Sequence, residues 1–243
     1  AVELEGALLG LPEAFPPFYR EVLLVELILR PGLVPGAEDH QPLDAVQAIS
    51  LARDLARLID EVQTENLSFP DLAEIVPPEL AEHWQITLEF LKIITEHWPA
   101  IRAETGFVDP AERRDAKLKL QARTWNKSPP KTPVYAAGST GSIPATANLL
   151  KVIASLPNGA VVLPGLDSGM TDEAWDAVGD DPTHPQFGMR ILLEYMEVER
   201  HDVRGWSADE TTNERARLLN ATLLPSYAGY SQSLANGIPH KAL

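Results

Sequence analysis

The spacing of apolar residues predicts helices over most of the first 130 positions. Between residues 43 and 64, apolar side chains recur every three or four positions, as in an amphipathic helix with one buried face. Residues 18–29 are predominantly apolar and predict a buried helix, and residues 78–101 predict a longer helix with an apolar stripe. Asp109 and Pro110 predict the start of another helix that runs to about residue 126, because aspartate caps helix N-termini and proline fits the first turn.

The pattern changes after the proline-rich segment 128–133, which we interpret as a stiff linker. Residues 134–137 predict a short strand that stops at Gly138, residues 144–156 predict a helix, and residues 160–163 predict a second strand. A strand, a glycine-rich turn, a helix and a second strand form a βαβ unit, which requires a parallel sheet covered by helices.

The predicted fold class is therefore helix-rich α/β. We expect a mostly helical domain at residues 1–127, the linker at 128–133, and an α/β domain with a loose C-terminal tail at 134–243. Three further helices are predicted, at residues 171–178, 184–198 and 213–223.

The charge distribution qualifies the first impression of an acidic protein. The chain has 35 acidic and 20 basic residues, a formal net charge of −15, which argues against a protein that coats DNA generally. Residues 116–165, however, contain no acid and six bases: Lys117, Lys119, Arg123, Lys127, Lys131 and Lys151. One interpretation is a basic strip for an anionic partner. The other is chance, with solvated bases on one helix followed by a buried βαβ unit that needs no charge.

Other compositional features exclude several classes of site. The absence of cysteine excludes disulfide scaffolds, thiolate zinc sites, iron–sulfur clusters and cysteine nucleophiles. No apolar run is long enough to span a membrane, and the N-terminal residues do not resemble a secretory signal. We therefore expect a cytoplasmic protein with no membrane partner, and a first residue other than Met suggests a fragment of a longer chain.

The glycine-rich turn at residues 138–142 is the clearest candidate binding site. It follows a strand and precedes a helix, where α/β proteins hold ligands and where backbone N–H groups favour phosphate. We expect Ser139, Thr140 and Ser142 to contact a nucleic-acid backbone, with Arg123, Lys127 and Lys131 along the basic strip. The alternative is a plain capping turn, in which Ser142 is the N-cap of the next helix and Pro144 lies just inside it.

The residues for nucleotide hydrolysis and metal binding are not recognisable. The turn lacks the Gly-Lys of a Walker A loop, and the acids after Asp167 do not follow an apolar strand in a Walker B pattern. His83 and His97 share a predicted helix face but lie about 21 Å apart along it, too far for one metal ion. We therefore expect no catalytic residues, no metal ligands and no cofactor in this chain.

Five segments resemble the B subunits of AddAB-type helicase–nucleases, which process DNA double-strand breaks for recombination. They are LARLIDEVQ at 55–63, LAEHWQITLEFLKIITEHWP at 80–99, PVYAAGSTGSIPATANLL at 133–150, AVVLPGLD at 160–167 and HPQFGMRILL at 184–193. The resemblance extends over roughly residues 43–224.

The resemblance implies a superfamily-1 helicase-like (P-loop NTPase-like) α/β domain with a helical insertion. In an active helicase, the strand equivalent to 134–137 ends in carboxylates that hold magnesium, whereas here Gly138, Ser139 and Thr140 follow it. This departure suggests a degenerate motor without ATP hydrolysis. The family's nuclease site lies in a region that this chain lacks, although the parent subunit belongs to an ATP-dependent helicase–nuclease.

Our leading hypothesis is a non-catalytic helicase-like region that supports single-stranded DNA binding or scanning, with a single-stranded or double-stranded DNA end as its partner. It would also pack against an AddA-type helicase–nuclease subunit. The alternatives are a pure protein-interaction module without DNA contact and an enzyme acting on nucleotides or phosphate esters through residues 138–142 and Asp167.

Overall fold

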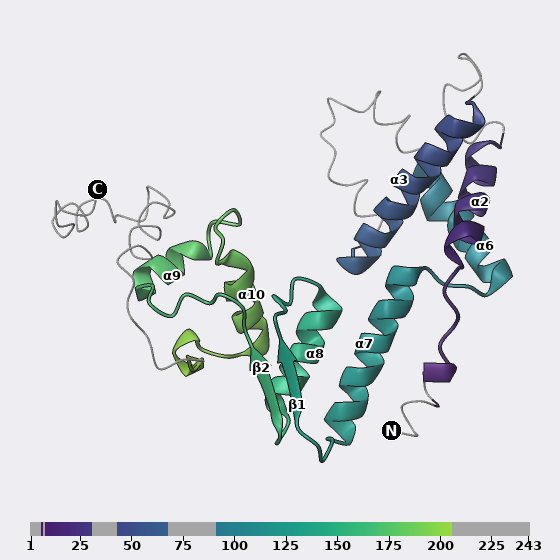
Figure 1. Cartoon of the computed structure of the whole chain (residues 1–243). Coiled ribbons are helices and arrows are strands. Elements are labelled where there is room, and N and C mark those ends of the chain that lie inside the picture. Colours follow the sequence, from purple (N-terminus) through teal and green to yellow (C-terminus); the bar gives the residue numbers. More distant parts are fainter. Residues whose placement is uncertain (1–5, 7, 31–42, 68–90, 206–243) are drawn as a thin grey trace, which may run out of the picture. The chain divides into compact units, whose positions relative to one another are not determined.

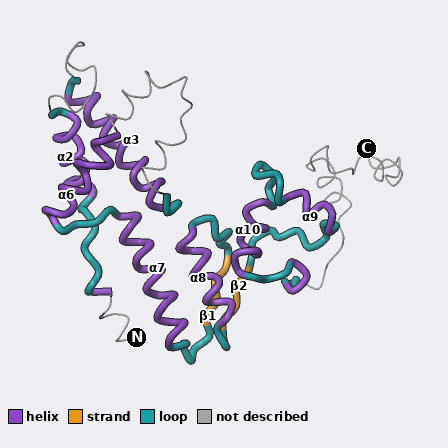
Figure 2. Tube along the Cα trace, turned by 180° about the vertical axis from the view of Figure 1, so that it is seen from behind, coloured by secondary structure: helices purple, strands orange, loops and turns teal. Residues whose placement is uncertain are grey.

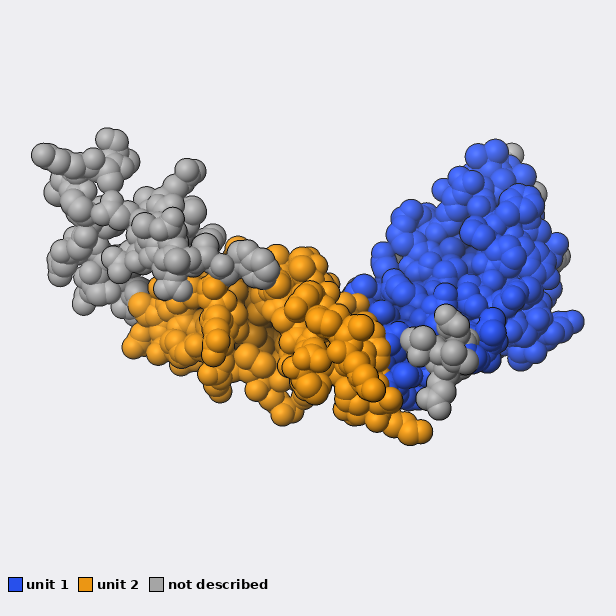
Figure 3. Space-filling model, turned by 60° about the horizontal axis from the view of Figure 1, so that its bottom comes forward, with its two compact units in different colours: residues 1–124, 143–145 blue, residues 125–142, 146–243 orange. Residues whose placement is uncertain are grey.

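The computed structural model describes residues 6, 8–30, 43–67 and 91–205 of the chain. It divides into two compact units, coloured separately in Figure 3. Unit 1 is Ala1–Thr124 with Ile143–Ala145, and unit 2 is Trp125–Ser142 with Thr146–Leu243. The predicted helix at 213–223 and the first part of the predicted helix at 78–101 lie outside the described residues.

The described part of unit 1 is helical, as its apolar periodicity predicts (Figures 1 and 2). Its elements are α2 (Pro17–Ile28), α3 (Ala45–Thr64), a π-helix (Ile93–His97), α6 (Trp98–Thr105) and α7 (Pro110–Lys127), whose last residues belong to unit 2.

Local capping determines where two of these helices begin or end. Asp44 and Gln47 form a reciprocal capping box at the start of α3, with the Asp44 carboxylate accepting from the Gln47 N–H at 2.7 Å. Gly106 ends α6 with a φ of 74°, a left-handed conformation in which a glycine has no Cβ penalty. The predicted helix at 43–64 is therefore confirmed.

The apolar core of unit 1 lies between α2, α3 and the segment around the π-helix. Its fully buried members include Leu24, Leu27, Ile59 and Trp98, with exposed fractions of 0 to 1%. The ring of Phe15 packs 5.0 Å from that of Trp98, centroid to centroid. This packing explains the apolar stripe of α3 and the predominantly apolar sequence of α2.

A buried carboxylate lies beside this apolar core. Asp109 is 0% exposed and forms an ion pair with Arg20 at 2.9 Å and with Arg102 at 3.5 Å. Its oxygens also accept hydrogen bonds from Gln63 Nε2 at 2.8 Å and from Trp98 Nε1 at 3.2 Å. One side chain therefore joins α2, α3, α6 and the start of α7.

Arg20 extends this network on the side of α3. It is 5% exposed, pairs with Asp60 at 2.9 Å and donates to the carbonyl of Ala56 at 3.4 Å. Its guanidinium lies 6.0 Å from the centre of the Trp98 ring, within range of a cation–π interaction. Because a buried charge without its partner is costly, the arginine and Asp109 stabilise each other's burial.

We predict that Asp109→Asn strongly destabilises unit 1. Asparagine keeps the capping ability and size of aspartate but removes the charge that compensates Arg20. The expected loss is about 3–5 kcal/mol, the range for breaking a buried ion pair by removing one partner. Hydrogen exchange of the α2 and α3 amides measures this loss locally.

The matched control is Asp54→Asn, which removes an exposed carboxylate paired with Arg57 at 3.2 Å. This change should cost no more than about 1 kcal/mol. Similar exchange rates in the two variants would contradict a stabilising role for the buried network.

Unit 2 is built on a two-stranded parallel sheet, which confirms the predicted βαβ unit. Strands β1 (Val134–Ala137) and β2 (Gly159–Val162) pair in the register Val134 to Gly159 and Ala137 to Val162. Helix α8 (Pro144–Ser155) connects them. After β2 come α9 (Asp172–Val178), α10 (Phe187–Met196) and a 3-10 helix, η3 (Arg200–Asp202).

Helices α8 and α10 cover one face of this sheet (Figure 1). The buried cluster of Ala147, Leu150, Met189, Leu192 and Met196 packs against Ala136 and Val161 from the strands. The described part of the chain is thus a helix-rich α/β protein, and none of its described helices has the length and hydropathy to cross a membrane.

The turn between α8 and β2 requires glycine at position 159. A Cβ added there would lie 1.9 Å from the carbonyl oxygen of Ile153 and 2.8 Å from the Cβ of Leu156. The chain therefore passes directly over the end of α8 on entering the sheet.

We predict that Gly159→Ala lowers the stability of unit 2 by at least about 2 kcal/mol, because backbone atoms must move to relieve the overlap. The thermal unfolding midpoint measures the effect. Gly188→Ala is the control, since a Cβ at this position of α10 meets nothing within 4 Å. It should be neutral or stabilising by up to about 1 kcal/mol. Equal midpoints for both variants would contradict the steric argument.

Candidate functional site

The loops after β1 and β2 leave the same edge of the sheet. The N–H of Gly138 donates to the carbonyl of Val162 at 3.2 Å, so residues 138–142 begin beside the start of the second loop. Gly138 and Gly141 have φ values of 78° and 63°, and a Cβ at Gly141 would lie 2.5 Å from Leu192. The glycines thus let the first loop turn sharply against α10.

The three hydroxyl residues of the first loop do not share one role. Ser139 is half-buried, and its Oγ accepts from the Gly141 N–H at 3.3 Å. Thr140 and Ser142 are exposed. Helix α8 begins at Pro144, so Ile143 occupies the N-cap position. Ser142, the N-cap in the alternative interpretation, lies two residues before the first residue of α8.

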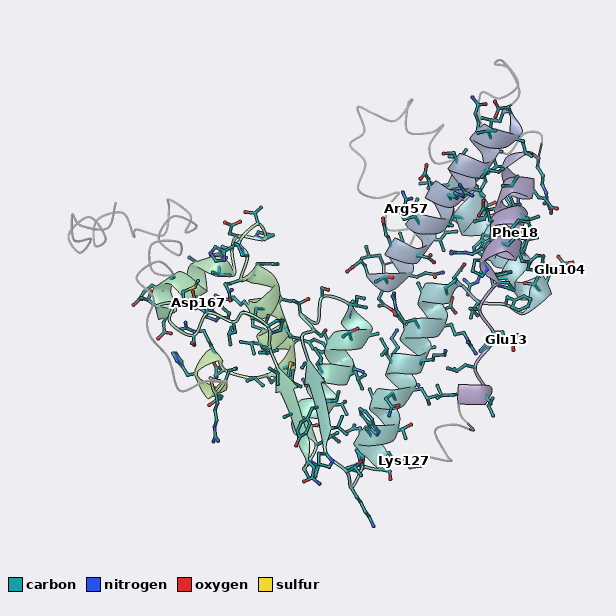
Figure 4. The ribbon with its side chains drawn as sticks, in the orientation of Figure 1. Glu13, Phe18, Arg57, Glu104, Lys127 and Asp167 are labelled. Carbon is teal, nitrogen blue, oxygen red and sulfur yellow. The ribbon has the colours of Figure 1, made fainter. Side chains whose placement is uncertain are left out.

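The second loop is held by two side chains that come later in the sequence. Gln186 accepts from the Asp167 N–H at 3.1 Å and donates to the Gly165 carbonyl at 2.9 Å. Arg200 donates to the carbonyls of Asp167 and Met170. Asp167 also accepts the N–H of Gly169 at 2.9 Å, closing a local turn in this loop (Figure 4).

Arg200 is a buried arginine at the centre of a polar cluster in unit 2, whose partners Asp172 and His201 are exposed. It is 5% exposed, pairs with Asp172 at 2.7 Å, and lies 5.4 Å from the centre of the Trp175 ring. His201 Nε2 lies 3.0 Å from the same Asp172 oxygen. The hydrogen bonds from Arg200 and then His201 hold the pKa of the Asp172 carboxyl below its ordinary value of 3.8.

The acidic residues after β2 have different surroundings. Asp172 is committed to its ion pair with Arg200, and Asp181 accepts from the N–H and hydroxyl of Thr183. Glu173, Asp176 and Asp180 are exposed. In the described ranges, no three His, Asp or Glu side chains gather closely enough to hold a metal ion.

Several basic residues of the acid-free window lie on helix α7. Lys119, Arg123 and Lys127 follow one another at four-residue spacing along α7, so they lie on one side of a single uninterrupted helix. We call these three residues the basic stripe; Lys127 is at its C-terminal end (Figure 4). Arg123 and Lys127 are exposed, as is Lys131 four residues further along the chain.

The basic stripe is also unpaired. Within the described residues, neither its three members nor Lys117 and Lys131 form an ion pair. Most bases elsewhere in the described part do so: Arg20, Arg53, Arg57, Arg102, Arg114, Lys151, Arg190 and Arg200. Five of the six bases of the acid-free window are therefore available to an external anion, whereas Lys151 pairs with Glu197 at 2.6 Å.

The predicted site residues fall into two groups along the sequence. Lys131 precedes β1 and Ser139 follows it, so a strand about 13 Å long separates them. Arg123 and Lys127 lie on α7, before Lys131. Ser139, Thr140 and Ser142 share the opposite, carboxyl end of the strand.

Sequence reasoning missed Gln186 and Arg200, the side chains that hold the second loop. They contact residues 19 to 33 positions earlier, so no local pattern points to them.

The chain matches no family model, no curated protein and no solved structure.

We predict that His201→Ala raises the pKa of the Asp172 carboxyl toward 3.8, because one of its two hydrogen-bonding side chains is lost. Since the folded-state pKa is depressed, the contact stabilises the fold above pH 3.8 and is lost as pH falls through the folded pKa. Carboxyl carbon NMR shifts followed during an acid titration measure the change.

Asp181 is the internal reference for this titration. Hydrogen bonds from Thr183 lower the pKa of its carboxyl, so the His201 substitution should leave it unchanged. An Asp172 carboxyl that titrates identically in the parent and the variant would contradict the proposed contact.

Proposed function

We propose that this chain is a non-catalytic, helicase-like region of an AddAB-type B subunit that holds single-stranded DNA along α7. In this proposal it acts in double-strand break repair and recombination and packs against an AddA-type helicase–nuclease subunit. The observation that carries the DNA contact is the unpaired basic stripe of Lys119, Arg123 and Lys127.

The geometry of the stripe suits a polyanion. Residues four apart on a helix rise about 6 Å, so the stripe presents three positive charges along about 12 Å. A strand whose phosphates replace bound counterions gains affinity from their release. Because the window 116–165 contains no acid, a bound phosphate meets no carboxylate from this stretch.

The α/β unit supports the helicase-like part of the proposal. It has a parallel sheet, a crossover helix and loops that leave the carboxyl edge, where motor domains of this class bind nucleotide. The first loop contains neither the lysine nor the carboxylate used for phosphoryl transfer. We therefore propose that the chain holds DNA and does not hydrolyse ATP.

The acidic residues in the rest of the chain affect the affinity of the isolated chain for nucleic acid. With a formal net charge of −15, the whole chain repels nucleic acid at long range while the basic stripe attracts it locally. Affinity of the isolated chain is thus expected to be modest and to increase when the A subunit contributes further contacts.

We predict that Arg123→Gln/Lys127→Gln weakens binding to a single-stranded oligonucleotide and reduces its salt dependence. Each lost phosphate contact lowers the slope of log K against log salt by about 0.7, so the double variant should lose about 1.4. Fluorescence anisotropy of a labelled oligonucleotide over a series of salt concentrations measures both quantities.

The matched control is Arg53→Gln/Arg57→Gln, which removes two positive charges at the same four-residue spacing on α3 (Figure 4). These side chains are 66% and 69% exposed and pair with Glu21 and Asp54. The control should keep the slope of the parent. Equal slopes for the two double variants, or no binding by the parent at low salt, would contradict the proposal and favour a protein-docking module.

A further inference from the structure

The two faces of the β1–β2 sheet have different surroundings. Ala136 and Val161 lie on the face that packs against α8 and α10. Tyr135, Ala137 and Ala160 are exposed, and because side chains alternate along a strand they belong to the opposite face. Tyr135 is the only large side chain among these three, and it is 73% exposed.

The neighbours of Tyr135 leave its ring accessible. Its partner in the sheet register is Ala160, and the next pair on the same face is Ala137 with Val162. Within the described residues, Tyr135 has no hydrogen bond and no ring contact. An exposed aromatic ring whose register partner is an alanine is open to a planar ligand from above the sheet.

The charges around this face favour a ligand that carries phosphate. Neither strand contains an acid, and the chain has none between residues 116 and 165. The nearest bases before β1 are Lys127 and Lys131, both exposed and without an ion pair in the described part of the chain. A nucleobase linked to phosphates therefore finds an aromatic surface and positive charge on consecutive segments of unit 2.

The size of the face argues against a protein covering it alone. Two four-residue strands present an area of about 130 Å², whereas a stable protein interface buries about 800 Å² on each partner. A single base is of the right size for one tyrosine ring.

We propose that Tyr135 stacks a base of single-stranded nucleic acid on the exposed face of the β1–β2 sheet. This inference rests on the proposed function and adds a second mode of contact to it. The basic stripe binds phosphates, while Tyr135 binds a base that is accessible only in an unpaired strand. The substrate class is then single-stranded rather than duplex nucleic acid.

The test compares two labelled oligonucleotides of about twelve nucleotides, one of normal thymidines and one of abasic sugar phosphates. The 243-residue chain is expected to bind the normal strand about tenfold more tightly than the abasic strand. Tyr135→Ala should remove this preference and keep the salt slope. Tyr135→Phe should retain the preference, because phenylalanine also stacks.

Phe18→Ala is the matched control, since Phe18 is an exposed aromatic residue of α2 with 78% of its surface accessible (Figure 4). It should leave the preference for bases intact. Arg123→Gln/Lys127→Gln should do the reverse of Tyr135→Ala, lowering the salt slope but preserving the preference.

The outcomes separate the two proposals. Equal affinity of the parent chain for both oligonucleotides, or a preference that survives Tyr135→Ala, overturns base stacking and leaves phosphate binding intact. The molecular mass of the particle that contains this chain is measured as well. If this mass is higher than in Tyr135→Ala and the chain shows no preference for bases, a protein covers this face and base stacking is overturned. No binding of either strand at low salt overturns both proposals.

Discussion

The burial of the Asp109 carboxylate is the constraint on which unit 1 depends. This side chain is fully buried, and it is compensated by Arg20 and Arg102 and hydrogen-bonded by Gln63 and Trp98. Its own carbonyl accepts the Arg113 N–H in the first turn of α7. The same residue therefore stabilises the helical core and determines where the helix with the basic stripe begins.

Unit 2 uses an analogous arrangement around a cation. Arg200 is buried beneath the loop after β2, where it contacts backbone carbonyls, the Asp172 carboxylate and the Trp175 ring. These contacts order the loop at the carboxyl edge of the sheet, while the residues with exposed positive charge or an exposed aromatic surface take no part in them. Residues that stabilise each unit and residues available for binding are thus largely distinct.

Local patterns in the sequence predict much of the fold. Apolar periodicity identifies α3, and the glycine-rich turn between two short apolar runs identifies the parallel βαβ unit. Asp109 is recognisable as a helix start, but its ion pair with Arg20 joins residues 89 positions apart, which no local pattern contains. The short apolar run at 134–137 identifies β1, yet only the packing of α8 and α10 shows that Ala136 lies on the covered face and Tyr135 on the opposite face.

We propose that single-stranded DNA contacts the basic stripe of α7 and, as a separate contact, Tyr135 of the sheet in unit 2. Ultraviolet cross-linking of a bound oligonucleotide, followed by mass spectrometry of the peptides, tests this most directly. The account predicts that cross-links concentrate between residues 119 and 142 and include Tyr135. Cross-links confined to α2 and α3, with none in that range, would contradict it.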